Sequence, residues 1–178
     1  MKNKLKFLIL LLITLSFSSC DEAEELLNLT RDFDDTIVET IAISIDKTTG
    51  NRATFSNTKV LSIDDPELQP YINKIKSVEI KNLSYKIINF SGDPTGDVNG
   101  EFLIDNIVYL TNAFVVKTEA DNGTIFKITE VAALNEIATK LKANKKLTAK
   151  YSGDALCDNE DMDIPIEITL SVKITVSL

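Results

Sequence analysis

The last fifteen residues alternate between apolar and polar side chains. Every even position from 164 to 178 holds Ile, Leu or Val, and the odd positions from 167 onward hold Glu, Thr, Ser or Lys. A period of two is typical of a β-strand with one buried and one solvated face. Such a strand would reach about 50 Å, whereas ordinary strands span roughly 17–20 Å. We therefore expect a bend, a bulge or a change of sheet within it.

Other parts of the chain also show strand patterns. Ile stands at 37, 41, 43 and 45, with Glu39 at the remaining odd position, which is a strand pattern. The apolar parity switches between Ile80 and Leu83, which predicts a bulge near Lys81 and Asn82. The Asp-Asn-Gly sequence at 121–123 is typical of a hairpin turn leading into a strand at 124–128. The composition of residues 91–100 predicts a loop.

Two segments have helical spacing. Apolar residues recur at i, i+3, i+4 and i+7 from Leu68, after an Asp-Asp-Pro start. In the second segment they recur with helical spacing at 131, 134, 137, 138 and 141. These patterns predict short helices at about 66–75 and 130–143. Because strands outnumber helices and few helices could form parallel crossovers, the sequence predicts a mainly β fold. We expect an antiparallel β-sandwich with one or two short covering helices.

The N-terminus has the pattern of a secretory signal. Lys2, Lys4 and Lys6 precede an apolar run at 7–17, which small residues follow. A membrane-spanning helix needs about 20 apolar residues, so this run is too short to be a transmembrane anchor.

Phe17-Ser18-Ser19-Cys20 resembles the lipobox of bacterial lipoproteins, although that family usually has Leu where Phe17 stands. The resemblance implies that residues 1–19 are a cleaved signal peptide and that Cys20 receives a diacylglyceryl group and an acyl chain such as palmitate. Several acyl chains together make a stable anchor. The membrane, held through Cys20, is thus one expected partner. Cys157 would then have no disulfide partner, and we expect it to be buried.

Residues 20–35 are predicted to form the lipidated end and an acidic tether, followed by one domain at 36–178. The acidic cluster after Cys20 resembles the surface-export signal of Bacteroidota-type lipoproteins. This resemblance implies an outer-membrane protein that faces outward, with a periplasm-facing orientation as the alternative. Asp35-Thr36-Ile37 also resembles an O-glycosylation pattern of that bacterial group, which makes Thr36 a candidate glycosylation site.

Composition excludes several kinds of chemistry. The chain has no His, which removes His-based acid–base catalysis and every His-containing metal site. A net charge of −8 argues against nucleic acid as a partner. No GxSxG nucleophile motif or Gly-rich phosphate loop occurs. We therefore expect no cofactor and no enzymatic activity.

Two acidic segments are candidate metal sites. Asp154, Asp158, Asp161 and Asp163 lie in an oxygen-rich stretch that could hold Ca²⁺, and Asp93, Asp97 and Asn99 form a second group. Neither group has EF-hand spacing. The simpler interpretation is a pair of solvated acidic turns between strands.

The leading hypothesis is a lipid-anchored cell-envelope protein that is not catalytic. Its β-sandwich would be a binding or structural module for an unknown protein or glycan ligand. One alternative is a carrier of a hydrophobic small molecule, with the helix at 130–142 over an opening between the sheets and a cavity lined by Ile and Phe. A third is a glycan-directed enzyme that uses two carboxyl groups.

Overall fold

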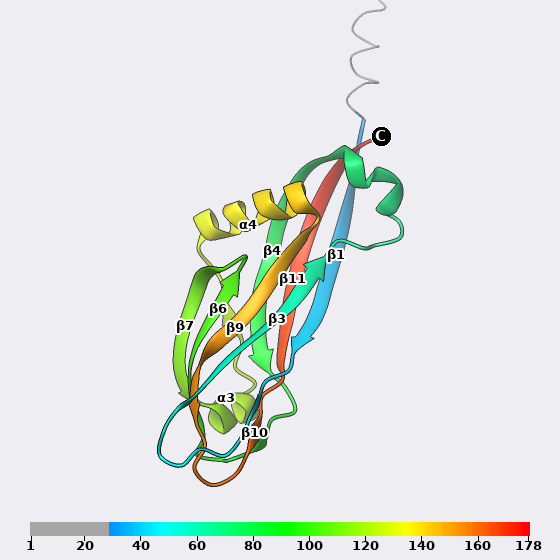
Figure 1. Ribbon diagram of the computed structural model, residues 1–178. Helices are drawn as coiled ribbons and strands as arrows, with labels where there is room; N and C mark the ends of the chain where they lie inside the picture. The colour runs from blue at the N-terminus through cyan, green and yellow to red at the C-terminus, as the bar shows by residue number, and fades with distance from the viewer. Residues whose placement is uncertain (1–28) are drawn as a thin grey trace, which may run out of the picture.

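Two four-stranded antiparallel sheets form the body of the computed structural model, which describes residues 29–178 (Figure 1). The first sheet has the order β1 (Thr30–Ile41), β11 (Ile166–Ser177), β4 (Ile75–Ile87) and β8 (Phe126–Lys127). The second has the order β3 (Ala53–Ser62), β9 (Lys146–Leu156), β6 (Asp97–Ile104) and β7 (Ile107–Val115). A small third sheet comprises β2 (Ser44–Ile45), β10 (Met162–Asp163) and β5 (Ser91–Gly92). The predicted mainly β, antiparallel sandwich is confirmed.

β11 is the central strand of the first sheet, between β1 and β4. Its even-numbered residues are at most 1% exposed, whereas its odd-numbered residues are half-buried. The predicted change of sheet also occurs. β10 pairs with β2 and β5 in the small sheet, and after Pro165 the chain enters β11 in the first sheet.

The predicted bulge lies on β4. Ser171 and Val172 of β11 are opposite Asn82 and Ile80, so Lys81 is the extra residue. An extra residue reverses the alternation of side chains along the strand. This is why the apolar parity switches at this point.

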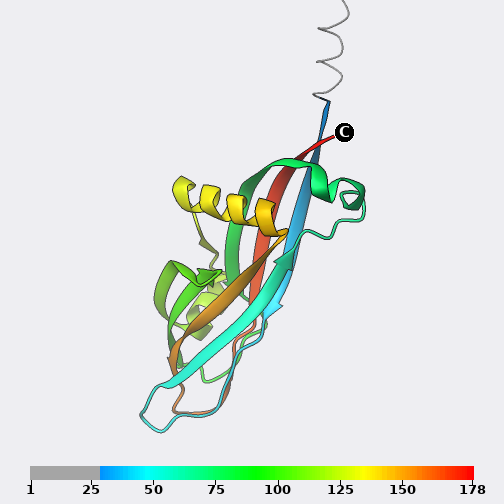
Figure 2. The same ribbon diagram turned by 45° about the horizontal axis from the view of Figure 1, so that its top comes forward.

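Both predicted helices are present. Residues 69–74 form η1 (Gln69–Lys74), a 3-10 helix, and α4 (Val131–Asn144) is an α-helix. α4 lies across one end of the sandwich, as Figure 2 shows, and packs mainly on β4 and also on β9. The side chains that α4 buries are Ala133, Ile137, Ala138 and Leu141.

The predicted hairpin turn at 121–123 is wrong. Asp121 and Asn122 end a third helix, α3 (Val116–Asn122), and Gly123 caps it with φ 61°, donating its N–H to the carbonyl oxygen of Ala120. The physical reason is that a glycine in the left-handed region ends a helix as readily as it closes a hairpin. The following strand, β8, pairs with β4.

The predicted loop at 91–100 is only partly a loop. β5 occupies 91–92, and β6 begins at Asp97 and pairs with both β7 and β9. Val98 and Gly100 of β6 are buried, so the second half of the predicted loop belongs to a strand. The hairpin that joins β6 to β7 turns at Asp105 and Asn106, which both have positive φ, as a two-residue hairpin turn requires.

The predicted boundary at residue 36 is also wrong. β1 begins at Thr30 and pairs with β11 along its whole length, so residues 30–35 belong to the sheet and not to a tether. Phe33 is buried at 6% exposure. Asp32 and Asp34 lie on the solvent side of the strand, where Asp32 forms an ion pair with Lys173 at 2.8 Å. Asp35 is half-buried on the opposite side, which it shares with Phe33.

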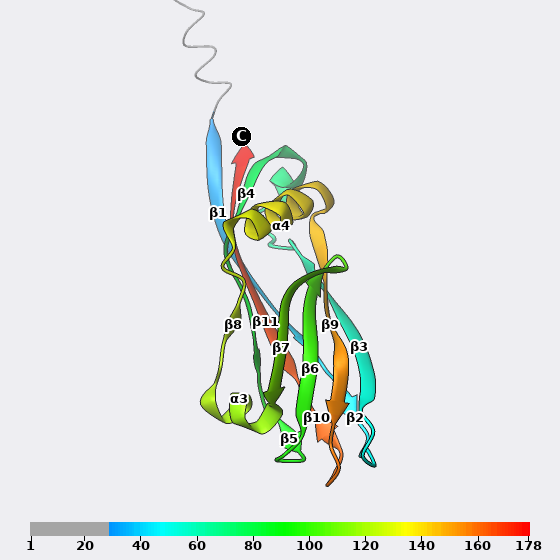
Figure 3. The ribbon, with the colours of Figure 1, turned by 90° about the vertical axis from the view of Figure 1, so that its left-hand side faces the viewer.

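The two ends of the described chain lie together. The Leu178 N–H donates to the Leu29 carbonyl oxygen at 3.0 Å. The small β2–β10–β5 sheet lies at the opposite end of the elongated sandwich (Figures 1 and 3). None of the helices in residues 29–178 combines the length and apolar character needed to cross a bilayer.

Candidate functional site

The end of the sandwich remote from Thr30 concentrates most of the polar contacts between distant parts of the chain. We call it the distal end and define it as the small sheet together with the turns at 46–52, 93–96 and 157–161. All of the acids considered as metal ligands lie there or on the adjoining ends of β6 and β9.

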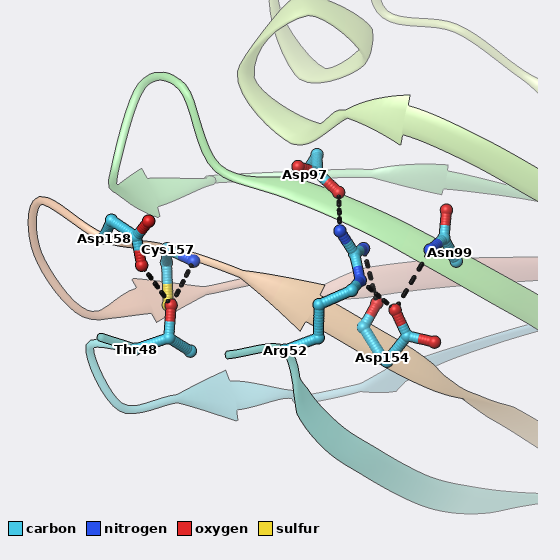
Figure 4. Close-up of polar contacts among 7 residues, drawn as sticks. All are labelled: Thr48, Arg52, Asp97, Asn99, Asp154, Cys157 and Asp158. Carbon is cyan, nitrogen blue, oxygen red and sulfur yellow. Dashed lines mark hydrogen bonds and ion pairs between the residues drawn. The ribbon is translucent and has the colours of Figure 1, made fainter. Parts of the chain in front are cut away.

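Arg52 joins two of these acids (Figure 4). Its guanidinium contacts Asp97 at 2.5 Å and also forms an ion pair with Asp154. Asn99 donates its side-chain N–H to Asp154 at 3.0 Å. The hydrogen bond from Arg52, with a smaller contribution from Asn99, lowers the pKa of Asp154. An arginine thus holds the position that a cation would take.

The sequence around Arg52 does not mark this residue as part of a site. The available signal was weak: Arg52 is one of only two arginines in a chain rich in lysine, and it follows a turn. Its partners, Asp97 and Asp154, are both distant in the chain, and Asp154 is 102 residues away, so the pattern around Arg52 does not reveal them.

Thr48, Cys157 and Asp158 form a second cluster. The Thr48 hydroxyl donates to Asp158 at 2.8 Å and accepts the Cys157 backbone N–H at 3.0 Å. The Gly50 backbone N–H also donates to Asp158, and these hydrogen bonds lower the pKa of its carboxyl. Cys157 is buried as predicted, and its thiol contacts the Asp46 carbonyl oxygen at 3.4 Å. The turns at 46–52 and 157–161 are thus tied together.

Asp93 is a fully buried carboxylate. It accepts four hydrogen bonds, from the backbone and side chain of Thr95 and from the backbone and side chain of Asn159. Burial alone would raise the pKa of Asp93, but these hydrogen bonds outweigh it and hold the pKa below its ordinary value. Asp93 therefore ties β5 and its turn to the 157–161 turn.

The other two candidate ligands have partners of their own. Asp161 accepts the Lys47 backbone N–H at 2.6 Å, and Asp163 accepts the Ser44 hydroxyl at 2.6 Å. Across residues 29–178, no three His, Cys, Asp or Glu side chains gather as metal ligands would. The four candidates, Asp154, Asp158, Asp161 and Asp163, instead bond to protein donors, and three of them connect β10 or its preceding turn to the β2 region.

A cavity of about 370 Å³ lies between α4 and β7. The residues that line it are Val108, Tyr109, Leu110, Lys127, Ile128, Thr129, Glu130, Ala132, Ala133 and Glu136. The Tyr109 hydroxyl is buried there without a hydrogen-bond partner, and its pKa is raised by burial and by the nearby Glu136. The lining contains one Ile, no Phe and several charged residues, which differs from the apolar cavity expected of a hydrophobic carrier.

The space between the two sheets is filled by aromatic side chains. The ring of Tyr85 lies 5.1 Å from that of Phe102 and 5.5 Å from that of Tyr151, between ring centroids. All three are at most 1% exposed. The opening between the sheets that the carrier hypothesis required is therefore occupied at this point.

The remaining candidates concern modification. Thr36 lies on exposed β1 opposite Ser171, to which its hydroxyl donates at 3.2 Å. The neighbouring Asp35 has one carboxylate oxygen buried without a hydrogen-bond partner, and burial raises its pKa. Glycosylation of Thr36 stays a prediction. The predicted lipidation site Cys20 and the predicted signal peptide at 1–19 lie outside the described residues.

Comparisons with known proteins identify no family. No family model matches the chain, and no curated protein matches it. Among solved structures, the decameric BFDV capsid protein is similar at 12% identity and a TM-score of 0.46, over 81% of this chain and 99% of that one. Desmodium yellow mottle tymovirus is similar at 12% identity and a TM-score of 0.35, over 81% and 84% of the two chains. No function follows from likenesses at this level.

Proposed function

We propose that this protein is a lipid-anchored outer-membrane protein whose β-sandwich is a non-catalytic binding or structural module that faces outward. The observation that carries the proposal is the direction of the elongated fold. The described chain starts at one end of the sandwich, and the hydrogen-bonded turns of the distal end lie at the other.

The direction of the fold determines which end of the sandwich an anchor at Cys20 would hold near the membrane. Residues 21–29 lie between Cys20 and the first residue of β1, and a segment of that length spans at most about 30 Å. Lipid chains on Cys20 would therefore hold the Thr30 end close to the membrane. The distal end would point away from it.

The contacts at the distal end favour recognition over catalysis. The carboxylates of the clusters described above accept hydrogen bonds from backbone and side-chain donors. None of these clusters therefore holds two unpaired carboxyl groups that could act as a general acid and a general base. Turns that are already ordered lose little conformational entropy when they bind a partner. A protein or glycan ligand is the partner class that this surface would serve.

The anchor is tested by changing Cys20→Ala in the full chain. We expect the altered protein to leave the membrane fraction and enter the aqueous phase in a detergent partition. Cys157→Ala is the matched control, because it removes the other cysteine, and that variant should stay with the membrane. Retention of the Cys20→Ala protein in the detergent phase would overturn the anchor.

Orientation needs a separate experiment. Gly50 lies in an exposed distal turn with open space around it, so a protease recognition sequence can be inserted between Gly50 and Asn51. Protease added to intact cells should cleave the inserted sequence if the distal end faces outward. Cleavage only after the outer membrane is opened would support the periplasm-facing alternative.

A further inference from the structure

Three long strands, β1, β3 and β7, lie at the edges of the two four-stranded sheets. An edge strand carries backbone N–H and C=O groups that no neighbouring strand satisfies. Proteins usually protect such an edge with charged side chains, with proline or by covering it. The three edges differ in this respect.

β1 and β3 are protected. β1 carries five charged residues, which are Arg31, Asp32, Asp34, Asp35 and Glu39. β3 lies beside β1, with an ion pair between Lys59 and Glu39 at 3.1 Å and a hydrogen bond from the Asn57 side chain to the Ala42 carbonyl oxygen at 2.5 Å. These two edges therefore close one side of the sandwich.

β7 lacks the charged side chains and the proline that protect an edge. Its sequence is IVYLTNAFV, which contains no charged residue and no proline, in a chain with a net charge of −8. Ile107, Val108 and Val115 are exposed at 39%, 45% and 38%. β6 is its only hydrogen-bonded neighbour among the described strands.

We propose that two copies of the chain associate by antiparallel pairing of their β7 strands, joining the two β3–β9–β6–β7 sheets into one. A second copy of the chain is the partner that the chemistry of the β7 edge favours. A neutral seam lets two acidic molecules meet without like charges opposite each other, which would weaken a strand pair. A second β7 supplies a neutral, apolar strand of matching length.

Twofold symmetry also matches the exposed residues. In an antiparallel pair of identical strands, the start of one strand lies beside the end of the other. The Val108 end of each β7 then meets the Val115 end of its partner, and this contact occurs twice. The same operation makes the two exposed apolar ends of the strands cross-strand neighbours.

The pairing has a geometric consequence. β7 runs along the long axis of the sandwich (Figure 3), so a twofold axis perpendicular to the strand points the Thr30 ends of the two copies in opposite directions. Copies held on facing surfaces would pair in this way more easily than neighbours standing upright on one membrane. The pairing itself does not depend on lipidation of Cys20.

The test is sedimentation equilibrium of the full chain in density-matched detergent micelles. We expect a monomer–dimer equilibrium whose dissociation constant Val115→Lys raises about tenfold or more, because two lysines enter the seam. Val60→Lys is the matched control. Val60 is an exposed valine on β3, at 47% exposure, and its replacement should leave the dimer unchanged. A monomer at all concentrations, or a dimer that Val115→Lys does not weaken, would overturn the proposal.

A second measurement does not require a disruptive substitution. Ala113→Cys places a thiol on the exposed side of β7, and a short thiol-to-thiol crosslinker should join two copies of that variant. Ser56→Cys on β3 is the control and should give only the background of the unaltered chain. Equal crosslinking of both variants would place the contact elsewhere and refute pairing through β7. A monomer that binds a strand of a different protein would also refute it.

Discussion

At the scale of single residues, the acids of the distal end act as structural ties. Asp93 illustrates this role, because it is fully buried and accepts four hydrogen bonds from Thr95 and Asn159. A buried carboxylate is tolerated only where donors replace its water. The interpretation of these acids as solvated turns is therefore correct for their position between strands and wrong for the exposure of Asp93.

Replacing Asp93→Ala should lower the free energy of unfolding by about 3 kcal/mol, because the buried donors of Thr95 and Asn159 lose their acceptor. Urea denaturation monitored by circular dichroism measures the change. Asp46→Ala is the control: Asp46 is exposed in a neighbouring turn, and its loss should change the free energy by less than about 0.5 kcal/mol. Equal effects of the two substitutions would contradict the structural role of Asp93.

At the scale of elements, the first strand shows how tertiary contacts override composition. The segment at 30–35 is acidic, yet it forms the start of β1 because Phe33 packs in the core and its ring lies 5.9 Å from that of Tyr71. The guanidinium of Arg31 lies over the Phe33 ring, 4.5 Å from its centroid. One buried aromatic residue thus commits the segment to the sheet.

Phe33→Ala should therefore destabilise the protein by about 3 kcal/mol, the usual penalty for truncating a buried Phe. A thermal or urea melt of the variant measures it. Leu29→Ala, one residue before β1 and 52% exposed, should change the stability by less than about 0.5 kcal/mol. If Phe33→Ala were as harmless as Leu29→Ala, residues 30–35 would be a tether after all.

At the scale of the whole molecule, the response to pH follows from the ionisable groups. The chain has no His, so no side chain has an ordinary pKa between about 5 and 8. The pKa values of Asp93, Asp154 and Asp158 are lowered in the folded state. Groups with a lowered pKa stabilise the fold above their unfolded pKa, and this contribution is lost as the pH falls toward the folded value.

We therefore expect stability to vary little between about pH 5 and 8 and to fall as the pH drops below about 4, where the carboxyls of the unfolded chain take up protons first. Asp35 contributes in the opposite direction, because its pKa is raised, but it is one group against four, since the hydrogen bond from Lys173 also lowers the pKa of Asp32. Urea midpoints from pH 8 to pH 2 test the expectation. A main loss of stability between pH 5 and 8 would be inconsistent with these groups.

Sequence patterns predicted the features that depend on neighbouring residues. The alternation along β11, the bulge at Lys81 and the apolar face of α4 each follow from a local period, since a residue's face is determined by its neighbours in the same element. The Asp-Asn-Gly turn was misassigned because a local glycine signal fits both a hairpin and a helix end. Such a choice depends on what the next segment packs against.

By itself, the sequence determined a mainly β chain with an alternating C-terminal strand and two covering helices, because periodicity and apolar content are local properties. Only the tertiary structure decided which strands lie at the edges and which acids accept hydrogen bonds from distant residues. An example is the hydrogen bond between Thr48 and Asp158, which lie 110 residues apart in the chain. The free energy of such contacts depends on how distant segments meet, and the pattern on either side of a residue carries no record of its partner.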